Sequence, residues 1–277
     1  MITSNLGRRL AVAAVGIPIV MVVAWSGGVV MAIGLGLLAA IGVGEIGRML
    51  SARGRPFLPG IAPVAAAALP AVAWTAGAGG GVLALAATLL AMSVVSTARI
   101  PPEVGPFRAT AASFTAVAYV GGLLAFALLL RERLVEDRTL GFALFLVPVA
   151  VTWLSDTAAY FAGRAFGRRP LAPIVSPNKT IEGGIAGLLA GPVTALLIAH
   201  LAVPELAAIG SAAVAATGTM ISAAAIFGDL AESALKRECG AKDSSRLLPG
   251  HGGLLDRMDS LLWAFPVAYA CFWFYLG

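Results

Sequence analysis

The residues most suited to chemistry lie in the charged stretch from Ser233 to Asp259 of an otherwise apolar chain, and just before it at Asp229 and Glu232. If residues 229–236 are helical, Asp229, Glu232, Ser233 and Lys236 fall on one face. Asp256 and Asp259 would share a helix face in the same way. Carboxylates from separate helices, with waters and substrate phosphates, suit a hard cation such as Mg²⁺. The sequence therefore predicts a site that holds a polyphosphate with metal and basic side chains.

Several of these features also have a simpler structural interpretation. Acids such as Asp256 and Asp259 at the start of a helix interact favourably with its dipole without any metal. His251 lies in a Gly-His-Gly-Gly turn, where a histidine is more often structural. Its neighbours Lys242 and Asp243 make phosphate binding credible, but we do not expect His251 to act as a general base.

A further group of candidates lies around Asp156, in an apolar run followed by a basic stretch. A carboxylate in hydrocarbon costs about 3 kcal/mol on insertion scales, so Asp156 needs a partner or a water-filled cavity. Three prolines between residues 170 and 177 prevent one continuous helix and predict a loop. Its basic side chains are Arg164, Arg168, Arg169 and Lys179. An ordinary basic loop would explain the arginines, whereas Asp156 together with Lys179 favours a functional site.

Composition places all these residues in a membrane protein. Hydrophobic residues make up 59% of the 277 residues, charged residues only 12%, and mean hydropathy is +0.92. Soluble globular domains of this length do not normally show such values. A helix needs roughly 20 mainly apolar residues to cross the hydrocarbon core. We therefore expect an all-α polytopic protein with about nine transmembrane helices, at approximately 10–25, 28–47, 59–76, 80–98, 109–130, 139–162, 183–203, 206–230 and 258–276.

Basic residues predict the orientation of these spans. With the N-terminus in the cytoplasm, all but three of the 19 basic residues fall on the inner side, as the positive-inside rule favours. The exceptions, Arg131, Arg133 and Arg138, share one loop with acids. We expect an N-in, C-out protein of the inner (plasma) membrane with its chemistry on the cytoplasmic side. The net charge of +5 is attributed to this topology and not to a nucleic-acid partner.

The chain is expected to form a single membrane domain with two functional parts. Residues 1–138 would be scaffold helices, with a short outer turn over 75–81, and residues 139–277 the catalytic helices and cytoplasmic loops. The first apolar segment is interpreted as an uncleaved helix. Glu45 is an acid near a membrane segment, which is costly and often functional. Because it lies close to the inner end of its helix beside Arg48, an interfacial ion pair is the favoured interpretation. Cys239 and Cys271 have no CxxC spacing, so neither a disulfide nor zinc is indicated.

Two motifs carry a resemblance to a known family. The pattern S-x-L-K-R-x4-K-D-x-S-x2-L-P-x-H-G-G-L-x-D-R-M-D, over residues 233–259, resembles the signature of the phosphatidate cytidylyltransferase (CDP-diacylglycerol synthase) family. The upstream patterns D-x-x-A-Y-x-x-G and S-P-x-K-T-x-E-G, within residues 156–183, are similar to that family as well. Asn178 departs from the pattern, because many members have a lysine there.

The resemblance implies transfer of CMP from CTP to phosphatidic acid in the bilayer, giving CDP-diacylglycerol and pyrophosphate in phospholipid biosynthesis. It implies Asp229 and Asp256 as Mg²⁺ ligands, and it leaves a second cation open. The other candidate catalytic residues are Lys236, Asp259, Lys179 and Asp156. The candidate contacts to substrate phosphates are Ser233, Arg237, Lys242, His251 and Arg257. A homodimer is an expectation at the level of the family.

Other classes of protein stay open at this point. A transporter also places Asp, Glu and Lys within its spans, although usually near the midplane, whereas these charges gather toward one face. A lipid or polyprenol kinase has similar needs for metal and phosphate binding. A CDP-alcohol phosphotransferase would need the spacing D-x2-D-G-x2-A-R-x8-G-x3-D-x3-D, which is absent.

Overall fold

The computed structural model describes residues 2–247, 250 and 252–276, with side chains from residue 14 onward. The chain divides into two compact units, and each is built from two stretches of sequence. Unit 1 comprises residues 1–129 and 238–258. Unit 2 comprises residues 130–237 and 259–277. The confinement of catalysis to residues 139–277 stays a prediction.

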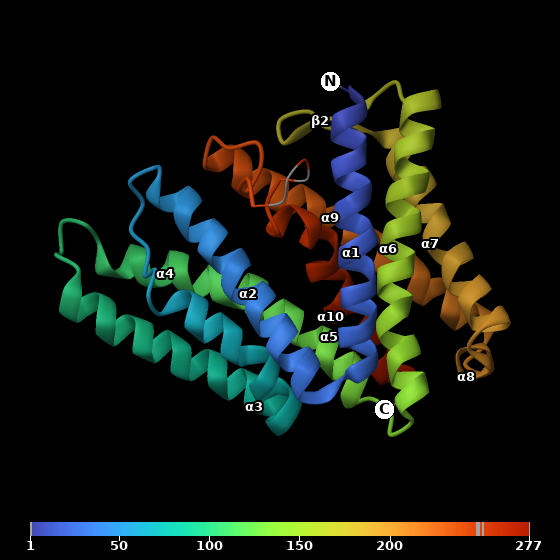
Figure 1. Cartoon of the computed structure of the whole chain (residues 1–277), viewed down its shortest axis with the longest axis horizontal. Coiled ribbons are helices and arrows are strands. Elements are labelled where there is room, and N and C mark those ends of the chain that lie inside the picture. The colour runs from blue at the N-terminus through green and yellow to red at the C-terminus, as the bar shows by residue number, and fades with distance from the viewer. Residues whose placement is uncertain (1, 248–249, 251, 277) are drawn as a thin grey trace. The chain divides into compact units, whose positions relative to one another are not determined.

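Unit 1 is a helical bundle in which small residues let backbones approach closely. Its elements are α1 (Ile2–Ser26), α2 (Gly28–Ser51), α3 (Ala62–Arg99), α4 (Pro106–Val117), the π-helical turn η1 (Ala118–Gly122), most of α5 (Leu123–Glu132) and the 3₁₀ turn η2 (Leu255–Arg257). α3 packs against α2 and α4, and α2 also contacts η1 and η2 (Figure 1). A Cβ at Gly36 would lie 2.6 Å from the carbonyl oxygen of Ala67, so only glycine permits this approach of α2 to α3.

α3 is not one continuous helix. Gly77 has φ 68° and ψ −171°, a conformation that essentially only glycine adopts, and it divides the helix into residues 62–76 and 78–99. This division agrees with the two spans predicted over 59–76 and 80–98. The predicted turn over 75–81 is wrong in extent, because Gly77 is the residue with non-helical dihedral angles.

Unit 2 is a second helical bundle with a small hairpin. Its elements are the end of α5, α6 (Arg138–Phe166), β1 (Pro170–Ala172), β2 (Ser176–Thr180), α7 (Ile181–Leu201), α8 (Pro204–Ala208), α9 (Ser211–Glu238) and α10 (Asp259–Leu276). α7 packs along α6, and α10 also contacts α6 (Figure 1). α7 and α9 touch through Gly191 and Gly218, where a Cβ on Gly218 would lie 2.5 Å from the carbonyl oxygen of Gly191.

The prolines after α6 do end the helix, as predicted, but the segment that follows is an antiparallel hairpin. Pro170 pairs with Thr180, and Ala172 pairs with Ser176. The all-α class is confirmed for the described residues, apart from this one small two-stranded sheet. Proline is tolerated there because a two-stranded sheet consists of edge strands, which need not donate at every position. Thr180 then caps α7, since its Oγ1 accepts a hydrogen bond from the Gly183 N–H at 3.1 Å.

A polytopic helical membrane protein is confirmed. Among the described residues, seven helices are long and apolar enough to cross a membrane. They are Gly28–Ser51, Ala62–Arg99, Pro106–Glu132, Arg138–Phe166, Ile181–Leu201, Ser211–Glu238 and Asp259–Leu276. α1 adds a shorter apolar stretch, Ala14–Ser26. The count of nine spans and their orientation stay predictions.

The predicted eighth span, 206–230, differs from α9 at both ends. α9 begins at Ser211 and continues to Glu238. The helix that carries Asp229 therefore also carries Ser233, Lys236 and Arg237. This continuity fixes the spacing of the motif residues along one helix.

Candidate active site

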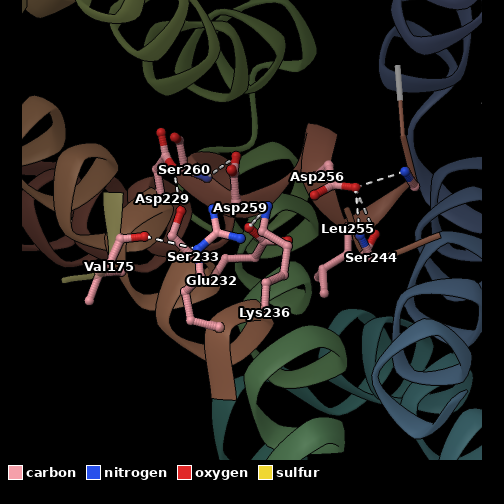
Figure 2. A network of polar contacts seen from close by, with 12 residues as sticks. Val175, Asp229, Glu232, Ser233, Lys236, Ser244, Leu255, Asp256, Asp259 and Ser260 are labelled. Carbon is pink, nitrogen blue, oxygen red and sulfur yellow. Dashed lines mark hydrogen bonds and ion pairs between the residues drawn. The ribbon is translucent and has the colours of Figure 1, made fainter. Parts of the chain in front are cut away.

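The charged cluster of unit 2 is built around Asp229 on α9. Lys179 of β2 forms an ion pair through Nζ with Asp229 Oδ2. Ser233, one helical turn further on, donates from Oγ to Asp229 Oδ1 at 3.4 Å (Figure 2). The side chains of Lys179 and Asp229 are 29% and 28% exposed, so a ligand can reach both members of the pair. The predicted common face of Asp229 and Ser233 is confirmed.

The hairpin is tied down on both sides of Lys179. Arg237 Nε donates to the carbonyl oxygen of Val175 at 3.3 Å, which joins the turn of the hairpin to the end of α9 (Figure 2). The carboxylate of Glu182 accepts hydrogen bonds from the backbone N–H groups of Arg168 at 3.0 Å and Arg169 at 3.4 Å. These bonds hold Lys179 where it meets Asp229.

Two further acids of unit 2 lie near Asp229. Asp156 on α6 lies within electrostatic range of Asp229 and Lys179, and Asp259 at the start of α10 lies within range of Asp229 and Lys236. Asp156 is exposed, and within the described part of the chain it makes no hydrogen bond or ion pair. Asp259 Oδ1 accepts from the Ser260 N–H at 2.7 Å (Figure 2).

The approach of α10 to α9 depends on Gly228, the residue before Asp229. A Cβ at this position would lie 2.6 Å from the carbonyl oxygen of Asp259 and 2.9 Å from Trp263. Glycine thus allows α10 to begin beside Asp229. Carboxylates from α6, α9 and α10 belong to one charged cluster in unit 2 as a result.

Lys236 has an acidic partner of its own on α9. Glu232, four residues earlier, is fully buried and forms an ion pair with Lys236, which is 9% exposed. A buried carboxylate needs such a cation, because its desolvation would otherwise be uncompensated. The predicted common helix face of Glu232 and Lys236 is thus confirmed, and the two side chains form an ion pair on it.

Unit 1 holds a second polar cluster, centred on Glu45 of α2. The Glu45 side chain is fully buried. Its Oε1 accepts hydrogen bonds from Ser245 Oγ at 2.5 Å and the Leu254 N–H at 3.0 Å. Its Oε2 accepts from Ser244 Oγ and the Leu255 N–H, both at 2.8 Å. Both carboxylate oxygens are thus engaged by residues of the motif segment.

The expected ion pair between Glu45 and Arg48 is wrong. Arg48 is exposed, and among the described residues the hydrogen-bond partners of Glu45 lie about 200 positions further along the chain. The signal that could have found this role is the presence of an acid inside an apolar helix. The three-residue spacing of Glu45 and Arg48 suggested a local partner. Such helical spacing contains no information about donors that lie about 200 residues further along the chain.

Asp256 is held by the same segment. Its Oδ2 accepts hydrogen bonds from the Ser244 N–H at 2.9 Å, Ser244 Oγ at 3.0 Å and the Gly253 N–H at 2.8 Å (Figure 2). Ser244 Oγ therefore lies within hydrogen-bond distance of both Glu45 and Asp256. Asp256 belongs to η2, whereas α10 begins at Asp259. The predicted common α-helix face of these two acids is wrong for that reason.

The two consecutive glycines of the motif, Gly252 and Gly253, lie where neighbouring atoms of unit 1 leave no space for a side chain. A Cβ at Gly253 would overlap Ser244 Oγ and would lie 2.7 Å from both carboxylate oxygens of Glu45. Gly252 has φ 81°, which favours glycine, and a Cβ there would lie 2.7 Å from Asp256 Oδ2. Both glycines are needed for the segment to close around the two carboxylates.

The remaining predicted residues have less defined settings. Lys242 and Arg257 are exposed on unit 1, and Arg237 is exposed on unit 2 with its contact to Val175. His251 lies outside the described residues. The described residues contain no group of three or more His, Cys, Asp or Glu side chains that could hold a metal ion. Mg²⁺ typically takes one or two carboxylates together with waters and phosphates, so the carboxylates of unit 2 around Asp229 suit a magnesium ion bound jointly with phosphates.

Comparison with known proteins supports an assignment to a family. The sequence model of the cytidylyltransferase family matches residues 7–275. The phosphatidate cytidylyltransferase of Haemophilus influenzae is 42% identical over 167 residues, which cover 58% of this chain and 55% of that protein. The Brucella suis protein of the same name is 48% identical over 133 residues, which cover 48% of each chain. The Staphylococcus epidermidis protein of that name is 35% identical over 193 residues, which cover 68% of this chain and 66% of that protein.

The matched region spans between 48% and 66% of the length of these curated relatives. The family resemblance inferred from the two motifs is confirmed by these matches.

Proposed function

The chain belongs to the cytidylyltransferase family, and from this premise we propose that it transfers CMP from CTP to phosphatidic acid. The products are CDP-diacylglycerol and pyrophosphate. The observation that carries the proposal is the accessible ion pair of Lys179 and Asp229, with Ser233 and the acids of α6 and α10 around it. The names of the relatives favour this reaction over the transporter and the kinase that composition alone left open.

The reaction exchanges one phosphorus–oxygen bond for another. A phosphate oxygen of phosphatidic acid attacks the α-phosphorus of CTP and forms a new bond to it. The bond from the α-phosphorus to the oxygen that bridges to the β-phosphorus breaks, and its electron pair leaves with pyrophosphate. The nucleophile is already an anion, so no side chain has to remove a proton. The principal obstacle is the repulsion between two anionic substrates.

The basic side chains of the motifs would reduce the repulsion between the two anionic substrates. Lys179 is held by the hairpin, and Lys236 by Glu232, so each would lose little side-chain freedom on binding a phosphate. We assign the substrate phosphates to these lysines and to further polar groups. The latter are Ser233, Arg237, Lys242, His251 and Arg257.

Asp229 and Asp256 are proposed as the principal Mg²⁺ ligands. Asp259 and Asp156 are proposed as further acids of the same site. The proposal includes a second cation bound beside the Mg²⁺. The assignment comes from the motif positions and from the suitability of carboxylate oxygens for a hard cation. When bound, the metal would neutralise charge on the phosphates and stabilise the departing pyrophosphate. The Asp256 carboxylate is oriented by Ser244 and Gly253 for any such role.

The membrane topology completes the proposal. Nine spans result if α1 crosses the membrane and the two parts of α3 on either side of Gly77 each cross it. An N-in, C-out orientation in the inner membrane then places the motif residues on the cytoplasmic side, where CTP is available. Phosphatidic acid would keep its acyl chains in the bilayer while its head group enters the site. A homodimer also remains part of the proposal.

An assay of purified protein in detergent, with radiolabelled CTP and phosphatidic acid, tests the reaction directly. We expect a Mg²⁺-dependent, lipid-soluble product that contains cytidine, which a kinase would not make. Asp229→Asn and Asp256→Asn should each lower kcat by at least about 100-fold, as loss of an electrostatic group at a phosphoryl site does. Both variants should retain the elution profile of the wild type, because neither opens a cavity.

The exposed Glu103 provides the matched control for these variants, and Glu103→Gln should retain full activity. Full turnover by Asp229→Asn or Asp256→Asn would reject the metal assignment. Absence of a cytidine-containing lipid with the wild type would reject the reaction itself.

A further inference from the structure

Glu45 has no part in the reaction as described above, yet its carboxylate is fully buried and accepts hydrogen bonds from four donors. Two of the donors, Ser244 and Ser245, lie at the start of one segment, and the other two, Leu254 and Leu255, lie at its end. One side chain of α2 therefore links residues 244–245 to residues 254–255, and these two described stretches are here called the loop. Separating them would leave a buried carboxylate without its donors, which is costly.

The same loop orients Asp256. Ser244 contacts Glu45 through Oγ and Asp256 through both its backbone N–H and Oγ. Leu255, which donates its N–H to Glu45, directly precedes Asp256 in the chain. Gly253 donates to Asp256 at 2.8 Å and has no space for a side chain, because Ser244 and Glu45 lie against it. A displacement of the Glu45 carboxylate would thus be transmitted to Asp256 through Ser244 and through the backbone.

We propose that Glu45 is a positioning residue for the cation site, and that it fixes the orientation of the Asp256 carboxylate through Ser244 and residues 253–255. The inference rests on the proposed role of Asp256 as a metal ligand. Groups that orient a metal ligand through hydrogen bonds commonly change metal affinity by about 10- to 100-fold when they are removed.

The substitution Glu45→Gln is a sharp test, because it preserves size and shape while it replaces one acceptor oxygen with an NH₂ donor. Each oxygen of Glu45 accepts from one hydroxyl and one backbone N–H. In either orientation of the amide, the NH₂ group faces the N–H of Leu254 or Leu255. A hydroxyl can rotate to become an acceptor, but a backbone N–H cannot. The loop must therefore shift.

The experiment measures Mn²⁺ binding by electron paramagnetic resonance on detergent-purified protein without substrates, and the Mg²⁺ dependence of turnover. We expect Glu45→Gln to weaken Mn²⁺ binding, and to raise the Mg²⁺ concentration for half-maximal activity, by about 10-fold. The KM for phosphatidic acid should change little. Glu103→Gln, the same substitution at an exposed acid of unit 1, should match the wild type in both measurements.

A milder variant keeps the test informative if Glu45→Gln does not fold. Ser245→Ala removes one donor to Glu45 without removing any donor to Asp256, and we expect a shift of about threefold in both measurements. The proposal is overturned if these variants lower only the melting temperature, with Mn²⁺ affinity and Mg²⁺ requirement unchanged, because Glu45 would then only anchor the loop.

Asp256→Asn separates this proposal from the one on which it rests. Loss of Mn²⁺ binding in Asp256→Asn with normal binding in Glu45→Gln would reject the positioning role alone. Normal Mn²⁺ binding in Asp256→Asn would reject the metal assignment, and the role of Glu45 with it.

Discussion

Lys179 of the β1–β2 hairpin and Asp229 of α9 form an ion pair whose two members are both partly exposed. Such a pair is not a buried structural bridge, since solvent and ligands can reach each charge. Under the proposed function, a substrate phosphate would replace the aspartate as the partner of Lys179, and a cation would replace the lysine as the partner of Asp229.

Lys179→Ala should lower kcat/KM for CTP by about 100-fold, because it removes a fixed cation from the phosphates. Arg164→Ala is the comparison, since Arg164 is exposed and donates to Tyr160 of its own helix at 3.2 Å. We expect at most about a threefold effect there, as for an exposed charge. Steady-state assays with radiolabelled CTP measure both. The reverse ranking would contradict the interpretation of the hairpin.

Gly228→Ala should destabilise unit 2 and impair activity together. The new Cβ would lie 2.6 Å from the carbonyl oxygen of Asp259, so α10 must move away from α9. Overpacking of this kind costs about 1–3 kcal/mol, and a lower melting temperature in detergent would register it. Gly122→Ala is the matched control, because no atom lies within 4 Å of its new methyl group. Equal melting temperatures for the two variants would contradict the close contact.

Thr180→Ala should loosen the junction between the hairpin and α7. The substitution removes the hydroxyl that accepts from the Gly183 N–H, and loss of such a helix cap costs about 1 kcal/mol. Thr180→Ser keeps the hydroxyl and should retain most of the stability of the wild type. Thermal unfolding in detergent distinguishes the two. An alanine variant as stable as the serine variant would exclude a capping role.

Alkylation of Cys239 should be slow at neutral pH. Burial raises the pKa of the Cys239 thiol above its ordinary value of 9.0, and the nearby acid Glu238 adds to the effect, while Arg55 and Arg53 oppose it. A raised pKa means less reactive thiolate at any given pH. The test measures the rate of alkylation by iodoacetamide as a function of pH in the Cys271→Ser variant. In the SDS-unfolded protein this rate reaches a plateau at a certain pH, and in the folded protein it should continue to rise above that pH. A plateau at or below that pH would contradict burial of this thiol.

The sequence allowed those parts of the site to be predicted that depend on local geometry. Asp229 and Ser233 meet because residues four apart share a helix face. The cost of an acid in hydrocarbon drew attention to Asp156, which lies within electrostatic range of Asp229 and Lys179. The partner of Asp229 was not predictable in this way, because Lys179 reaches it only through a hairpin. Proline excludes a helix in that segment, but it does not specify the strand pairing that replaces it.

Glu45 illustrates the same limit over a longer distance. A helical period relates it to Arg48, whereas its donors are brought to α2 by the tertiary fold of unit 1. The break in α3 was predicted in part. Hydropathy indicated a division of this helix, but the composition of residues 75–81 suggested a turn longer than the single break at Gly77.

The assignment of residues 238–258 to unit 1, between α9 and α10 of unit 2, has a practical consequence for work with fragments. Severing the chain once between residues 129 and 130 would give an N-terminal piece without the residues that donate hydrogen bonds to Glu45. An uncompensated carboxylate would then remain inside that piece, which is strongly destabilising. Co-expression of two halves should therefore succeed only if the second half can insert its loop into the first, and neither half should fold well alone.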